Sequence, residues 1–303
     1  MRLLLCFLFF PLFLRAEIPF LPWYTGPLIT PSALNEAKGQ YNVQPYLFAQ
    51  WEFGQYGDHM DRPHLFLVSP QVSFQTGLSS FLDLTIYLGG TYQKQRSISA
   101  MAWNDSQITF GFQILRERPF VPNVRFTLTE SLPTGKYEHF SQERSAVEAT
   151  GLGSYTTTLA FNFSKSSHLF SSHPLAWRGS ISALLPTRGH YQGLSLYGGG
   201  EGMSAQIRPG YGFSASTSLE CSLTQNWVVS WEWTYQQQGS AKWLEGSDVN
   251  HYSLDPSYLL TTCPGVEYNL SEHAGFLAGV LISILGKNQP KSLSLGVSFT
   301  YSW

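Results

Sequence analysis

From Tyr41 onward, apolar and polar side chains alternate at every second position. The end of the chain shows this most clearly: Leu293, Leu295 and every second residue to Trp303 are apolar, whereas the residues between them are serine, glycine or threonine. A period of two is typical of a β-strand whose two faces meet different surroundings. No helical stripe of comparable length competes, so the pattern predicts an all-β chain.

We predict about twelve strands, most of them long enough to cross a bilayer with tilt. The connections support this, because the odd-numbered ones average about 12 residues and the even-numbered ones about 5, as long outer loops and short periplasmic turns would. Fourteen strands result if 190–199 pairs as an extra hairpin. The predicted strands are 41–54, 64–75, 81–94, 106–116, 122–133, 151–164, 173–186, 206–222, 227–237, 252–269, 275–286 and 291–303.

Composition narrows the class of sheet. Of 303 residues, 43% are hydrophobic and 15% aromatic, but only 13% are charged, and the net charge is −2. The mean hydropathy of −0.10 excludes a bundle of apolar helices, and the lack of a basic surplus argues against a nucleic-acid partner. These values favour an antiparallel transmembrane β-barrel with lipid outside and a polar interior over a soluble β-sandwich.

The N-terminus predicts export. Residues 1–16 combine Arg2 with an apolar run, as in a signal peptide. We therefore expect a signal peptide at 1–16, a periplasmic lead at 17–40 and the barrel at 41–303, in the bacterial outer membrane.

Two features of the strands bear on how they fit a membrane. Aromatic residues gather near strand ends on the apolar face, which predicts two girdles at the membrane surfaces. Prolines inside strands remove ladder hydrogen bonds, so we expect gaps or bulges at Pro45, Pro70, Pro256 and Pro264.

Four segments resemble parts of known outer-membrane proteins. The C-terminal Phe299, Tyr301 and Trp303 look like the signature read by the barrel-insertion machinery. Ser131-Leu-Pro-Thr-Gly-Lys-Tyr137 and Gly151-Leu-Gly-Ser-Tyr155 are similar to outer-membrane transporters labelled "meta-pathway of phenol degradation", and Tyr24-Thr-Gly-Pro-Leu-Ile-Thr-Pro31 looks like the lead-in of related proteins. The resemblance implies a barrel that passes small solutes, and it brings no catalytic residues.

A few charged residues fall on the inward face. One interpretation is a mixed-charge zone that lines a pore and sets selectivity; the other is a salt-bridge network inside a filled barrel. The candidate lumen-lining residues are Asp83, Arg125, Arg178, Arg208, Glu220, Glu232 and Glu267.

The predicted function is passive passage of small solutes without a cofactor. Leu184, Leu277, Leu281 and Leu285 also fall on the inner face, which suits hydrophobic or aromatic solutes. The alternative is a structural or surface-exposed protein with a closed barrel and partner-binding loops. The partners expected are membrane lipid, the insertion machinery and the solutes.

Enzymatic and metal-binding functions have little support. His139 and Ser141 lie two residues apart in the predicted loop 134–150, away from the bilayer, and His168 and His173 have no third ligand nearby. We predict no catalytic residue and no metal site.

Overall fold

The computed structural model describes residues 23–57, 64–170, 173–246 and 255–303. The predicted signal peptide and the first residues of the strand predicted at 252–269 lie outside the described residues. Among the described residues, no helix is both long and apolar enough to cross a membrane.

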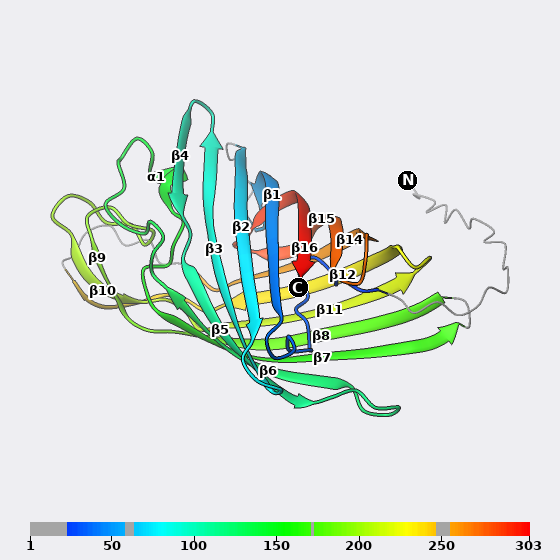
Figure 1. The fold of residues 1–303 in the computed structure, drawn as a ribbon. Coiled ribbons are helices and arrows are strands. Elements are labelled where there is room, and N and C mark those ends of the chain that lie inside the picture. Colours follow the sequence, from blue (N-terminus) through cyan, green and yellow to red (C-terminus); the bar gives the residue numbers. More distant parts are fainter. Residues whose placement is uncertain (1–22, 58–63, 171–172, 247–254) are drawn as a thin grey trace.

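The chain forms a closed antiparallel barrel (Figure 1), as predicted. Each barrel strand pairs with the barrel strand before and after it, and β1 pairs with β16 to close the ring. The twelve barrel strands are β1 (Tyr41–Gln55), β2 (Leu65–Gly77), β3 (Leu82–Gln95), β5 (Ser106–Leu115), β6 (Asn123–Leu132), β7 (Thr156–Phe170), β8 (His173–Pro186), β11 (Gly212–Ser222), β12 (Trp227–Gln238), β14 (Ser257–Asn269), β15 (Ala274–Lys287) and β16 (Pro290–Ser302).

The end of the chain closes the barrel. The backbone N–H groups of Tyr41 and Trp303 each donate to the other residue's carbonyl at 3.0 Å. Their rings stack with centroids 5.7 Å apart, and Trp303 also stacks on Tyr301. The C-terminal aromatic residues therefore form part of an aromatic row at the short-turn end of the barrel, which also includes Phe74.

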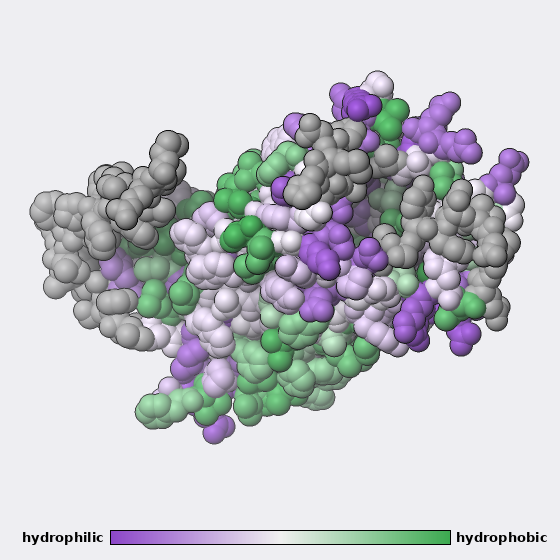
Figure 2. All heavy atoms as spheres, turned by 180° about the vertical axis from the view of Figure 1, so that it is seen from behind, coloured by the Kyte–Doolittle hydropathy of each residue, from purple (hydrophilic) through white to green (hydrophobic). Residues whose placement is uncertain are grey.

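The two faces of the wall have the predicted chemistry. Inward-facing Ser73, Thr109 and Ser298 are buried, whereas outward-facing Leu47, Trp231 and Leu295 are 44%, 49% and 45% exposed. Figure 2 shows apolar side chains over a broad area of the lower wall. So much exposed apolar surface needs a non-aqueous environment, because it exceeds what a soluble monomer shows to water.

Three of the four prolines interrupt the ladder as expected. The β1–β16 pairing skips Pro45, the β2–β3 pairing skips Pro70 and the β14–β15 pairing skips Pro264. Register is the same on both sides of each gap, so a proline removes bonds locally without shifting the strands. Pro256 instead precedes β14.

At the long-loop end the sheet departs from the prediction. β4 (Ile98–Trp103) pairs with the upper part of β3, so the β3 hairpin turns at Arg96 and Ser97 and extends beyond the ring. The strand predicted at 206–222 is broken at Pro209-Gly210 into β10 (Ser204–Arg208) and β11. A Cβ on Gly210 would clash with the Gly239 carbonyl oxygen, so the two connections lie side by side there in close contact.

A small cap covers this end of the barrel. β9 (Gly189–Gln192), β10 and β13 (Lys242–Gly246) form a separate three-stranded sheet, so 190–199 does not add a hairpin to the ring. Tyr191, Tyr197 and Ile207 are its buried core. The four-residue helix α1 (Ser145–Glu148) lies against β3 and β4.

Candidate functional site: the barrel lumen

An extended segment of the chain crosses the inside of the barrel. We define the lumen segment as residues 23–40, the described part of the stretch that we expected to be a periplasmic lead. It contacts the inner faces of β14 and β12, then of β6, β5 and β3, and reaches β1 beside β2, where Lys38 pairs with Gly77. Leu28, Thr30 and Ala33 are buried. The segment therefore occupies the place where a solute would pass.

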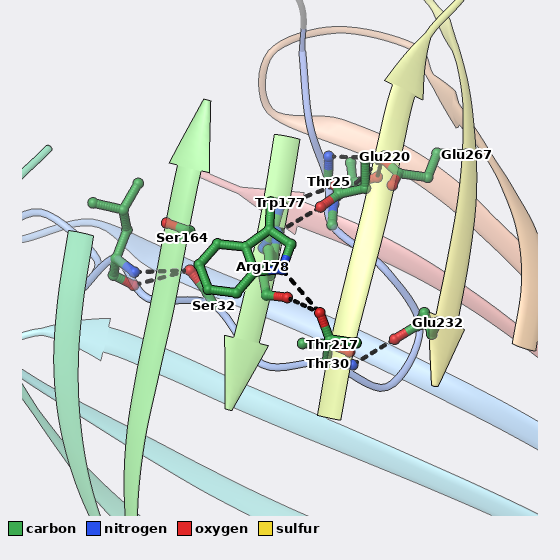
Figure 3. Close-up of polar contacts among 12 residues, drawn as sticks. Thr25, Thr30, Ser32, Ser164, Trp177, Arg178, Thr217, Glu220, Glu232 and Glu267 are labelled. Atoms are coloured by element: carbon green, nitrogen blue, oxygen red, sulfur yellow. Dashed lines mark hydrogen bonds and ion pairs between the residues drawn. The ribbon is translucent and has the colours of Figure 1, made fainter. Parts of the chain in front are cut away.

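One carboxylate holds the middle of the segment. Glu232, on β12 and 1% exposed, accepts hydrogen bonds from three consecutive backbone N–H groups. Leu28 N–H donates at 2.8 Å, Ile29 N–H at 3.1 Å and Thr30 N–H at 2.6 Å. Figure 3 shows the bond between Thr30 and Glu232. Successive N–H groups that converge on one anion make charge-assisted bonds, which are stronger than neutral ones. Glu232 is thus the main polar anchor of the lumen segment.

A second carboxylate holds the start of the segment. Glu267 Oε2 accepts from the backbone N–H and the hydroxyl of Thr25, at 3.2 and 3.0 Å, and from Gly26 N–H at 3.3 Å. Beside it, Arg178 pairs with Glu220 at 2.7 Å. Gly26 has φ +99°, and a Cβ there would meet the Arg178 guanidinium at 2.9 Å, so only glycine fits this approach.

An ion pair on the opposite wall holds the end of the segment. Arg125 on β6 donates to Asp83 on β3 at 2.6 Å, and both are buried. Arg125 also donates to Asn35 Oδ1 at 2.7 Å, and Asp83 accepts from Glu36 N–H at 3.2 Å. Gln113 adds a bond to Ala33 O and accepts from Asn35 N–H. The pair therefore has partners in both the wall and the segment.

Six of the seven candidate lumen residues lie inside the barrel. Asp83, Arg125, Glu232 and Glu267 bond to the lumen segment, and Arg178 packs against it while paired with Glu220. This arrangement combines the two interpretations of the charges, because the side chains line the lumen and each also makes a hydrogen bond or ion pair within a filled barrel.

Two sequence assignments need correction. Arg208 does not line the lumen: it lies on β10 in the cap, because the break at Pro209-Gly210 separates β10 from the barrel, and its guanidinium sits 5.2 Å from the Tyr211 ring centroid. Leu285 does not face inward either. A bulge in β14–β15 pairs it with Leu260, which lies opposite the outward Tyr235.

The sequence carried one unused signal for the lumen segment. No charged residue occurs from Ile18 to Asn35, a stretch that contains four prolines. An uncharged apolar segment would be poorly solvated in the water outside a barrel. Inside the barrel it is buried, and its backbone N–H groups then need polar partners. The inward carboxylates supply them.

An apolar cluster lies under the middle of the segment. Leu28 packs against Cys263 and Leu277, with Ile29, Tyr46 and Leu281 around them. The inward leucines at 277 and 281 were predicted, but their partner is the segment itself. These leucines therefore pack against the lumen segment and also give the lumen an apolar side.

The glycine motifs that resemble known transporters form a loop junction. A Cβ on Gly135 would lie 2.8 Å from the Gly151 Cα, so the two loop edges touch. The Asp105 carboxylate accepts from Gly135 N–H at 2.9 Å and Leu152 N–H at 2.8 Å. This junction fixes the loop that leads into α1.

Glu148 holds the same loop from the other side. It accepts from Lys136 Nζ at 3.0 Å and from Ser141 N–H at 2.7 Å. Burial alone would raise the pKa of Glu148, but the bonds from Lys136 and Ser141 outweigh it, so its pKa lies below the usual value.

Two candidate arrangements, a pair of Ser141 with His139 and a metal cluster, can be checked in the described residues. The Ser141 hydroxyl has no hydrogen-bond partner among them, so it does not pair with His139. No group of three or more metal-ligating side chains occurs in the described part of the chain.

The closed ring, the apolar outer wall and the polar lumen define a twelve-stranded transmembrane β-barrel of the outer-membrane class. Among solved structures, it is similar to the COG4313 outer membrane channel from Pseudomonas putida F1, with a TM-score of 0.69 and 11% identity over 88% of this chain and 96% of that chain. At this identity the likeness establishes the fold.

Two further structures are more distant. The translocator domain of the autotransporter NalP from Neisseria meningitidis gives a TM-score of 0.45 with 11% identity, over 86% of this chain and 87% of that one. The TodX deltaS2S3 mutant monoaromatic hydrocarbon channel gives 0.42 with 11% identity, over 92% and 95%. No family model and no curated protein matches the sequence.

Proposed function

We propose that this protein is a channel of the bacterial outer membrane that lets small solutes cross passively after the lumen segment shifts. The observation that carries the proposal is how the segment is held. It is bound by hydrogen bonds and one apolar cluster, all of which can break without breaking the barrel wall. A similar fold in a solved outer membrane channel supports the same function.

The lumen also has open volume toward both ends of the barrel, on either side of the segment. A cavity of about 430 Å³ at the short-turn end is lined by Thr25, Glu36 and Arg178, among others. At the long-loop end lie two more cavities. The lumen segment therefore lies between two open spaces, as a gate in a solute path would.

The mixed lining suits small solutes with both apolar and polar parts. Leu277 and Leu281 offer an apolar surface beside the polar walls. We infer that small hydrophobic or aromatic solutes belong to the substrate range, and that the aromatic C-terminus directs insertion into the outer membrane.

Liposome swelling tests the proposal. Vesicles that contain the processed protein should swell in small neutral solutes, and a variant lacking residues 23–36 should swell faster. Empty vesicles are the control. If neither protein passes any solute although both are folded, the proposal fails.

The filled lumen also favours a second candidate, a closed structural barrel whose cap binds partners. The buried ion pairs and the cap core fit this function. It requires that deletion of residues 23–36 leave vesicles impermeable, whereas the channel requires the opposite, so the same experiment separates the two.

A further inference from the structure

Two cavities meet at the long-loop end of the barrel, between the rim of the wall and the cap. One measures about 170 Å³ and the other about 460 Å³. They share Leu152, Gly210, Gln238, Ser257 and Gln289, so they form one space, which we call the vestibule. The larger part alone reaches the size range of small-molecule sites.

The vestibule carries amide and hydroxyl groups beside apolar side chains. Gln236 and Gln238 lie on the inward face of β12, in the same alternation as Glu232, and Gln289 donates to Ser257 Oγ at 2.9 Å. Leu184 and Leu259 face the same space from β8 and β14. The amides offer both donors and acceptors, whereas the leucines offer a surface for a ring or short chain.

Charge is scarce in this lining. Among the described lining residues, Asp255 is the only charged one, and it already has an interaction. An anion would meet no basic side chain there and would lose its hydration without compensation. A neutral polar group would instead exchange its water for amide partners.

The walls of the vestibule are held in place by the cap. Gly210 and Gly239 are in close contact, and Gly239 N–H donates to Tyr211 O at 2.8 Å. Leu152 is fixed through its N–H on Asp105, and Tyr191 donates to its carbonyl at 2.7 Å. A space with fixed walls binds a small ligand at low entropic cost.

We propose that the vestibule is a binding site for small neutral solutes that combine an apolar ring with an amide or hydroxyl group. The site would collect such solutes before passage, so this inference rests on the proposed channel function. Selection by charge takes place here, above the charged side chains that hold the lumen segment.

Three isosteric probes test this class: benzamide is neutral, benzamidine is a cation and benzoate is an anion. Binding to the full processed protein in nanodiscs is measured by calorimetry, with empty nanodiscs as the blank. We expect benzamide to bind at least about tenfold more tightly than benzoate, because one unmatched polar or charged group costs about that much. Equal affinity for benzoate, or tighter binding of benzamidine, would overturn the assignment.

Variants locate the site. Gln238→Leu keeps the size of the side chain but removes the amide, and it should weaken benzamide binding about tenfold. Gln142→Leu, at an exposed position in the outer loop, is the matched control. If Gln238→Leu does not fold, Gln236→Leu serves in its place. Unchanged affinity in a folded vestibule variant contradicts the site.

Transport and binding can fail separately. Benzamide binding without vesicle swelling would support the vestibule site and contradict the channel function. Vesicle swelling without saturable benzamide binding would support the channel function and contradict the vestibule site.

Discussion

At the scale of single residues, the barrel interior depends on a few carboxylates that act on backbone groups. Glu232 and Glu267 accept from consecutive N–H groups of an extended segment. These bonds give that segment the partners that a strand would find in a sheet. A buried carboxylate without them would be strongly unfavourable, so the anchors and the segment stabilise each other.

Removing the charge of Glu232 should loosen the lumen segment. Glu232→Gln replaces charge-assisted bonds with neutral ones, at a cost of about 1.5–3 kcal/mol. We expect single-channel conductance in planar bilayers to rise or to fluctuate more often. Glu52→Gln is the control, because Glu52 bonds to Gln50 and not to the segment. Identical traces for both variants would show that Glu232 does not hold the segment.

Glu148 makes the outer loop sensitive to acid. Its pKa is lowered by Lys136 and Ser141, so its contribution to stability is present above the unfolded pKa and is lost as pH falls through the lower folded value. The protection factor of the Ser141 amide, which is the unstructured exchange rate divided by its own rate at the same pH, should therefore fall in acid.

The matched variant for this loop is Glu148→Gln, which should show a low Ser141 protection factor already at neutral pH and little further loss of protection in acid. Exchange that stays slow in that variant would mean that Glu148 is not what protects the loop.

At the scale of elements, the alternation of each strand separates lipid from lumen. Leu295 lies outward near the middle of β16, whereas Ser292 on the same strand faces inward, opposite Glu52. The two positions are close along the chain, but one faces lipid and the other faces the lumen.

Arginine at these two positions should give different results. Leu295→Arg places a charge in hydrocarbon and should lower folding stability in lipid vesicles by about 2–4 kcal/mol. Ser292→Arg finds Glu52 across the strand pair and should be close to neutral. Denaturant titration followed by tryptophan fluorescence measures both. Equal losses would mean that the wall is not surrounded by lipid as we describe.

At the scale of the whole molecule, the lumen segment links walls that are far apart in the ring. It bonds to β14 and β12 at one end and to β6, β5 and β3 at the other. Of the charged wall side chains that contact the segment or pair beside it, its removal would leave four carboxylates, Asp83, Glu220, Glu232 and Glu267, against the two guanidinium groups of Arg125 and Arg178.

The opened lumen should therefore select cations. In a KCl gradient, the variant lacking residues 23–36 should show a reversal potential that favours K⁺ over Cl⁻. Adding Glu220→Gln and Glu267→Gln should move that potential toward zero. A preference for Cl⁻ in the deletion variant would show that these carboxylates do not border the ion path.

The sequence by itself determined the barrel. The strands are long and alternate with a period of two, and long connections alternate with short ones. These features together indicate a sheet with lipid on one face and a polar interior on the other. The predicted bounds agree with most strands within a few residues. Local chemistry also marked Pro45, Pro70 and Pro264 as ladder gaps. These features depend on neighbours along the chain, which the sequence shows directly.

Only the tertiary structure decided what fills the barrel. The bonds of Leu28 to Thr30 with Glu232 span about 200 residues of chain, and no local pattern encodes such a pairing. The same holds for Arg208, which lies in the cap because the break at Pro209-Gly210 separates β10 from the barrel strand β11. Alternation tells which face a residue takes, but which segments share the enclosed space follows from how the ring closes.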